Sequence, residues 1–177
     1  KVIKIKIGLS KIFNSAKSRN QLGFNAGASV TDLIIPYMTI GMEYARINPF
    51  VYQNLIPAQS YASQNYTLGD WIGQNADRLT AWAKYNPAPR LSMRMQLDYI
   101  RKGRDGSVED QYFAEPQPAF LSGRFEIQKQ LLLEAKYQLL NQLSVTGSYF
   151  KQGGVIRPAL QPSAVPQEFR FGVSYGL

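Results

Sequence analysis

The chain contains neither cysteine nor histidine among its 177 residues. Without cysteine it has no disulfide framework, no thiolate nucleophile and no soft metal site. Without histidine it lacks the commonest general base, every Ser-His-Asp or Cys-His arrangement, and the usual zinc and iron ligand sets. Catalysis by carboxylates or lysine alone remains open. We nevertheless expect no enzyme, no bound metal and no cofactor.

Long apolar runs are also missing, because no stretch approaches the ~18 residues that a transmembrane helix requires. We expect no signal peptide within these residues, since Lys1 leads directly into alternating sequence. These features predict a mature form or a fragment of a longer protein, and the fragment interpretation is favoured.

Acidic residues are few, with 12 Asp and Glu against 20 Lys and Arg, which gives a net charge of +8. A basic balance indicates nucleic acid, anionic lipid or acidic polysaccharide as a partner. The basic residues are spread along the chain and match no nucleic-acid-binding motif, so we expect no nucleic acid partner.

Period-two alternation of apolar and polar residues, by contrast, recurs along the whole chain. In residues 90–102, Leu91, Met93 and Met95 alternate with Ser92 and Arg94. Ten such residues, tilted as in a barrel, span roughly 25 Å. This length fits the apolar band of an outer-membrane barrel, although a soluble sandwich or lipocalin-like barrel alternates as well. The predicted strands are 3–9, 21–31, 37–47, 77–86, 90–102, 120–139, 143–151 and 169–177.

The connections alternate between short and long. Short turns are expected near 32–36, 86–90 and 140–142, and long loops at about 14–20, 48–76, 103–119 and 152–166. Outer-membrane barrels have short periplasmic turns and longer external loops. We therefore expect the long loops to be extracellular and the C-terminus to lie at the periplasmic side.

Aromatic residues and the C-terminus support the membrane interpretation. With this topology, aromatic rings fall at both ends of the apolar strand faces, as in interfacial girdles. The outer group is Phe24, Tyr44, Tyr99, Phe125, Tyr149 and Phe169, and the inner group is Tyr85, Tyr137 and Tyr175. The chain alternates up to Leu177 and is similar to a terminal β-signal, in which Phe is the more usual last residue.

The predicted fold is an all-β, antiparallel, up-and-down transmembrane β-barrel. Residues 1–177 form a single domain of about eight strands, expected to be part of a larger barrel.

The segment 48–76 is rich in aromatic and amide side chains, which suit stacking on sugar rings and pairing with hydroxyls. The alternative is a loop that folds inward, with the same side chains satisfying one another. The candidate carbohydrate ligands are Tyr61, Asn65, Tyr66, Asp70, Trp71, Gln74, Asn75 and Asp77.

Two further groups carry charge in the predicted external segments. Arg101, Lys102 and Arg104 form a basic cluster that is able to engage acidic sugars or lipopolysaccharide phosphates, although an exposed hairpin rim that solvates itself is the alternative. Asp70 and Asp77 offer a carboxylate pair of the glycosidase type. Nothing else in the sequence supports catalysis.

The segments 43–52 (EYARINPFVY), 68–77 (LGDWIGQNAD), 85–87 (YNP) and 98–103 (DYIRKG) resemble the Bacteroidota branch of the Wzi-type capsule assembly family. The resemblance covers residues 43–103. It implies an outer-membrane barrel with about twice as many strands, of which this chain is the C-terminal half. It also implies a lectin-like, non-catalytic role in holding surface polysaccharide, with sugar contacts in the external loops.

Three functions therefore remain open. The first is a polysaccharide-binding barrel, and the second is a diffusion channel for anionic solutes. The third is a structural subunit that contacts other outer-membrane proteins. In the bacterial outer membrane the expected partners are lipid, lipopolysaccharide and surface polysaccharide. The basic lumen residues that favour a channel are Lys4, Lys6, Arg78, Arg94 and Arg124.

Overall fold

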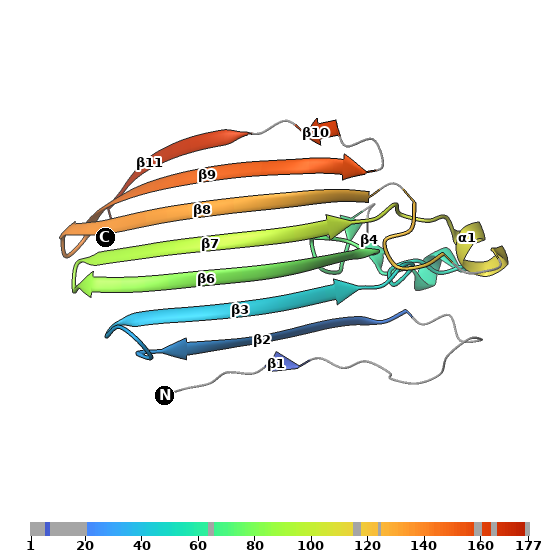
Figure 1. Ribbon diagram of the computed structural model, residues 1–177, viewed down its shortest axis with the longest axis horizontal. Coiled ribbons are helices and arrows are strands. Elements are labelled where there is room, and N and C mark those ends of the chain that lie inside the picture. The colour runs from blue at the N-terminus through green and yellow to red at the C-terminus, as the bar shows by residue number, and fades with distance from the viewer. Residues whose placement is uncertain are drawn as a thin grey trace.

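The computed structural model describes residues 6–7, 21–63, 66–114, 118–123, 125–157, 161–163 and 166–175. Its main element is one antiparallel sheet (Figure 1). The seven long strands are β2 (Gly23–Thr31), β3 (Met38–Ile47), β6 (Ala76–Ala88), β7 (Leu91–Lys102), β8 (Phe125–Leu140), β9 (Leu143–Arg157) and β11 (Gln167–Tyr175). Two short strands, β1 (Lys6–Ile7) and β10 (Gln161–Ser163), pair with β2 and β9.

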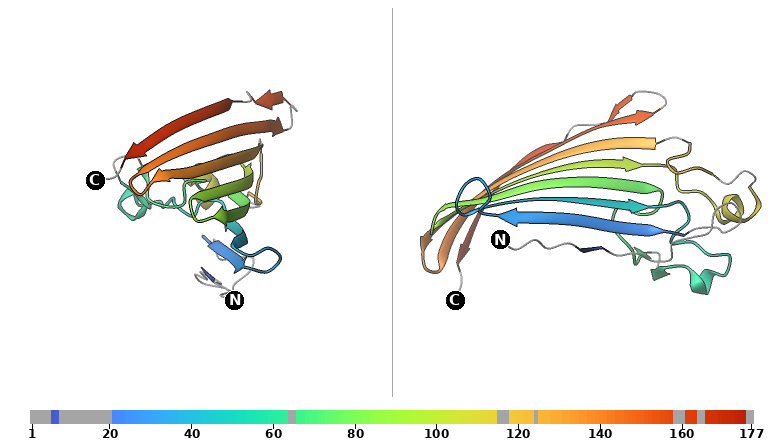
Figure 2. Two further views of the ribbon diagram at one scale, coloured as in Figure 1. Left: turned by 90° about the vertical axis from the view of Figure 1, so that its left-hand side faces the viewer. Right: turned by 60° about the horizontal axis from the view of Figure 1, so that its bottom comes forward.

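The sheet is an up-and-down meander, because each long strand pairs antiparallel with the next long strand in the chain. This confirms the predicted all-β, antiparallel architecture. The sheet forms one curved and twisted layer (Figure 2), and within the described residues it does not close on itself. Seven of the eight predicted strands are present as long strands in the described residues. The first predicted strand, 3–9, lies outside the described residues except for β1.

The two ends of the sheet differ as the sequence predicts. One end, here called the turn end, holds the short connections 32–37, 89–90 and 141–142. The opposite loop end holds the segments 48–75 and 103–124 (Figure 1). Segment 48–75 contains a 3-10 helix (Pro57–Gln59) and the small hairpin of β4 (Ala62–Ser63) and β5 (Tyr66–Thr67). The loop expected at 14–20 lies outside the described residues.

Three boundaries differ from the expectation. The loop expected at 152–166 begins later, because β9 pairs with β8 as far as Arg157, opposite Phe125. The strand expected from residue 120 begins at Phe125, because residues 118–123 turn, with positive φ angles at Leu121 and Gly123. Segment 103–124 also contains an unexpected helix, α1 (Val108–Phe113). No helix in the described part of the chain is long and apolar enough to cross a membrane.

Exposure on the two faces is the reverse of that in a soluble sandwich. One face of the sheet, here called the apolar face, carries the large hydrophobic side chains and is exposed. Met95 of β7, for example, is 42% exposed. The polar face is more covered, and Thr80 of β6 is only 9% exposed. A soluble sandwich would bury the first face and expose the second. An exposed apolar face is the arrangement expected of a membrane barrel, whose apolar face meets lipid.

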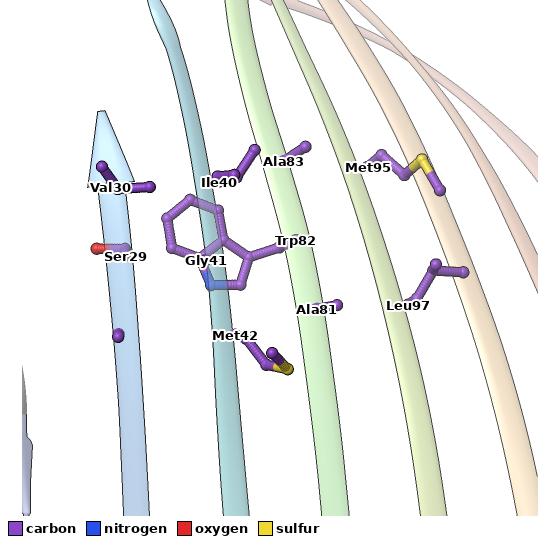
Figure 3. A pocket seen from close by; sticks show the side chains of 11 residues that line it. Ser29, Val30, Ile40, Gly41, Met42, Ala81, Trp82, Ala83, Met95 and Leu97 are labelled. Carbon is purple, nitrogen blue, oxygen red and sulfur yellow. The ribbon is translucent and has the colours of Figure 1, made fainter. Parts of the chain in front are cut away.

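Trp82 of β6 lies across Gly41 of β3 on the polar face, as the close view of this part of the sheet shows (Figure 3). A Cβ atom at position 41 would lie 2.5 Å from the indole ring. Any larger residue would therefore displace the indole, which explains glycine at this strand position.

Candidate functional site

The segment between β3 and β6 folds over the polar face at the loop end. Ile72 of this segment is buried in a small apolar cluster, against which Val51 and Tyr52 also pack. The other cluster members come from the ends of three adjacent strands: Ala45, Ile47, Ala76 and Ile100. The segment thus follows the inward-folding alternative, since its apolar side chains cover one end of the polar face.

Asn75 joins three loop-end segments. Its amide nitrogen donates to the carbonyl of Arg104 (2.8 Å), and its side-chain oxygen accepts from the N–H of Leu121 (2.8 Å). Its backbone N–H donates to the carbonyl of Asn48, and its own carbonyl accepts from the N–H of Gly103. The side chain is 1% exposed, and φ is 52°. Asparagine tolerates this left-handed conformation better than most residues do.

Gln74 and Lys102 make a second link between the loops. The Lys102 ammonium donates to the Gln74 carbonyl (2.7 Å) and pairs with Asp105 at 3.0 Å. The Gln74 side-chain oxygen accepts from the N–H of Tyr52 at 3.3 Å. The side-chain oxygen and backbone carbonyl of Gln74 and the ammonium group of Lys102 are thus all bonded within the protein.

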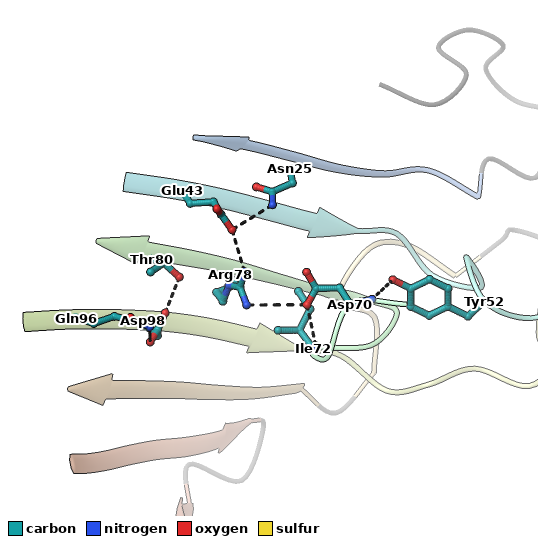
Figure 4. A network of polar contacts seen from close by, with 9 residues as sticks. All are labelled: Asn25, Glu43, Tyr52, Asp70, Ile72, Arg78, Thr80, Gln96 and Asp98. Atoms are coloured by element: carbon teal, nitrogen blue, oxygen red, sulfur yellow. Dashed lines mark hydrogen bonds and ion pairs between the residues drawn. The ribbon is translucent and has the colours of Figure 1, made fainter. Parts of the chain in front are cut away.

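Asp70 is held between the loop and the sheet (Figure 4). Its backbone N–H donates to the Tyr52 hydroxyl (2.9 Å), and its carboxylate accepts from the N–H of Ile72 (3.1 Å). The same carboxylate lies 4.0 Å from the Arg78 guanidinium, which also pairs with Glu43 at 3.0 Å. A positive charge on the polar face is therefore shared between two carboxylates.

Tyr52 holds the turn at residues 69–72 through its hydroxyl and its ring. Burial raises the pKa of its hydroxyl above the ordinary value, although the N–H of Asp70 acts in the opposite direction. The phenol therefore stays protonated at neutral pH. Its ring lies directly against Gly69, where any Cβ atom would collide with it. Glycine at position 69 is therefore required by this close approach.

Two aromatic rings remain open to solvent above this framework. Trp71 is 65% exposed, and its ring centroid lies 5.2 Å from the guanidinium carbon of Arg78. Tyr61 is 54% exposed and stacks on Tyr52, with 6.0 Å between ring centroids. Cation–π and stacking contacts restrict how these rings move. Each ring is thus a partly fixed, exposed aromatic platform.

Asp77 points to the other face of the sheet. It is buried there, accepts from the Tyr44 hydroxyl (2.9 Å) and forms a two-point ion pair with Arg101. Asp70, in contrast, pairs with Arg78 on the polar face. The glycosidase-type pair of Asp70 and Asp77 is therefore wrong, because the sheet separates the two carboxylates.

The predicted basic cluster is also divided. Arg101 is paired with Asp77 on the apolar face, whereas Lys102, the next residue, faces the polar side. Arg104 is exposed in the loop. Asn65 and the side chain of Tyr66 lie outside the described residues. Among the described residues no group of three His, Cys, Asp or Glu side chains is arranged to hold a metal.

Three contributors were missed in the sequence. Tyr52 stacks on Tyr61 and accepts a hydrogen bond from the N–H of Asp70. The ring of Phe120 lies 3.9 Å from the guanidinium carbon of Arg46. Gln21 donates to carbonyls in the 48–75 segment. These contacts join residues that are not neighbours in the chain, so no local sequence pattern predicts them.

The model of the family described as capsule assembly protein Wzi matches residues 20–150, which include β2 to β8, about half of β9 and both loop-end segments. The chain belongs to the Wzi family. Proteins of the Wzi family are outer-membrane β-barrels of a non-catalytic, lectin-like kind. The predicted resemblance is therefore confirmed. Comparisons with curated proteins and with solved structures gave no match.

Proposed function

We propose that this chain holds surface polysaccharide, without chemical change, at its loop end. The observation that carries the proposal is the exposed Trp71 ring, anchored over Arg78. An aromatic platform of this kind stacks on the apolar face of a pyranose ring. Because the tryptophan is restrained before binding, less conformational entropy is lost on association.

Tyr61 is the second platform, since it is joined to Trp71 through Tyr52 and Asp70. Two rings at separate positions suit a chain of sugars better than a single small molecule. Arg104 adds an exposed positive charge that is suited to an acidic sugar. Asn65 and Tyr66 remain candidate ligands in the same segment.

Gln74, Asn75 and Asp77 take a different part in this proposal. They are buried, and the side chain of each forms at least one hydrogen bond within the protein. Arg101 and Lys102 are likewise engaged by Asp77 and by Gln74 with Asp105. These five residues fix the loops that present Trp71 and Tyr61. The loop end then lies outside the cell, and the turn end lies in the periplasm.

Binding of purified surface polysaccharide to the intact, detergent-solubilised protein tests the proposal. We expect Trp71→Ala to weaken binding about threefold to tenfold, because an aromatic stacking contact is worth ~0.5–1.5 kcal/mol. Tyr61→Ala should act in the same direction.

The matched control is Phe113→Ala, which removes another exposed ring at the loop end, on α1. Circular dichroism should show the same strand content for all variants. Phe113→Ala should bind as tightly as the unchanged protein. If Trp71→Ala does so as well, the proposed sugar surface is wrong.

A further inference from the structure

The apolar face carries a groove beside the β11 edge of the sheet. Its floor contains Ala135 of β8 and Gly147 of β9, which are cross-strand neighbours. A Cβ atom at Gly147 would meet nothing within 4 Å, so the floor is open. The volume is about 680 Å³. The larger apolar side chains around it are Met93, Met95, Leu133, Tyr149, Phe169 and Phe171.

Two lysines lie on the same face, between this groove and the loop end. Lys151 is two residues beyond Tyr149 on β9, and Lys129 is four residues before Leu133 on β8. Even spacing places all four side chains on one face of the sheet. Both lysines are exposed, and the ion pairs of the described residues include neither. Lys129 lies 6.0 Å from the centroid of the Tyr99 ring, so both lysines bring a positive charge to this face with no carboxylate partner among the described residues.

A second apolar hollow lacks this feature. It has a volume of about 510 Å³ and is lined by residues of β2, β3, β6 and β7, including Met42 and Leu97 (Figure 3). On the same face, toward the loop end, Arg101 is neutralised by Asp77 and Arg46 is covered by Phe120. The groove beside β11 thus differs from the hollow by two lysines on neighbouring strands, neither of which is in an ion pair, whereas one of the two arginines near the hollow is neutralised.

We propose that the groove beside β11 binds a membrane lipid whose headgroup carries a phosphate, with the phosphate between Lys129 and Lys151. An acyl chain then lies over Ala135 and Gly147. Four residues separate Lys151 from Gly147, or roughly 13 Å along the strand, so one lipid reaches both parts. A bound phosphate offsets the repulsion between the two ammonium groups. The inference is independent of the polysaccharide proposal.

Native mass spectrometry of the delipidated full-length protein in detergent provides the test. The probes are dipalmitoylphosphatidylglycerol, dipalmitoylglycerol without a phosphate, and glycerol phosphate without acyl chains. We expect the phospholipid to bind on the order of tenfold more tightly than dipalmitoylglycerol, because two ion pairs are gained. Glycerol phosphate alone should not be retained. The double variant Lys129→Gln with Lys151→Gln should remove the preference for phosphate.

The groove itself is tested with two glycine variants. Gly147→Leu fills the floor and should weaken binding of both lipids. Gly172→Leu is the matched control, because a Cβ atom at Gly172 also meets nothing within 4 Å, and this residue lies on the polar face of β11. Equal binding of the two lipids, equal effects of the two glycine variants, or an unchanged preference in the lysine variant would each overturn the proposal.

Discussion

Asn75 shows how one residue type suits two roles. The sequence assigned this amide to sugar binding, because exposed amides pair well with hydroxyls. In the structure its side chain bonds to Arg104 and Leu121, which are 29 and 46 residues away in the chain. Local sequence contains no information about such distant partners. The residue type was therefore predictable as functional or structural, but the choice between these roles was not.

Asn75→Ala should release the loop end without unfolding the strands. The substitution removes the side-chain hydrogen bonds to the carbonyl of Arg104 and from the N–H of Leu121, each worth about 0.5–1.5 kcal/mol. Hydrogen exchange at Leu121 should therefore become faster. Asn141→Ala in an exposed turn is the control and should leave this exchange unchanged. Unchanged exchange in Asn75→Ala would show that this residue does not tie the loops together.

The strands were predictable and the loop-end elements were not. Alternation along residues 90–102 placed β7 within a residue at its start, because side chains on a strand reverse faces at every step. Helix α1 was missed although its N-terminus carries a capping box, in which Ser107 and Asp110 bond reciprocally. Six residues show too little periodicity for a helix to stand out. The inward fold of 48–75 depends on the burial of Ile72 between three strands, which only the assembled sheet provides.

This packing predicts that the segment 48–75 obstructs any channel along the polar face. The unchanged protein should show little conductance in planar bilayers. Ile72→Asp places a charge in the apolar cluster and should expel the segment, which increases the frequency of openings. Leu55→Asp, at an exposed position of the same segment, should not. Steady open currents in the unchanged protein would favour the diffusion channel over the polysaccharide-binding barrel.

At the scale of the whole molecule, the decisive feature is the reversal of exposure across one sheet. The apolar face of β7 is open while Thr80 and Asp98 on the other face bond to each other at 2.5 Å. The sequence predicted both faces because the alternation fixes which residues share a side. It could not fix which face would be covered, since a sandwich and a barrel share the same alternation. Membership of the Wzi family agrees with the barrel. The role as a subunit of a larger complex stays a prediction.

The proposed polysaccharide site depends on which end of the barrel faces outward, so the most direct measurement is cysteine labelling in intact cells. The described chain has no cysteine, and a single one is therefore introduced at Ala58 in the loop end or at Asn141 in the turn end, both exposed. A membrane-impermeant maleimide should label Ala58→Cys in intact cells, and Asn141→Cys only after the outer membrane is permeabilised. Labelling of Asn141→Cys alone in intact cells would contradict the external placement of Trp71 and the polysaccharide surface built on it.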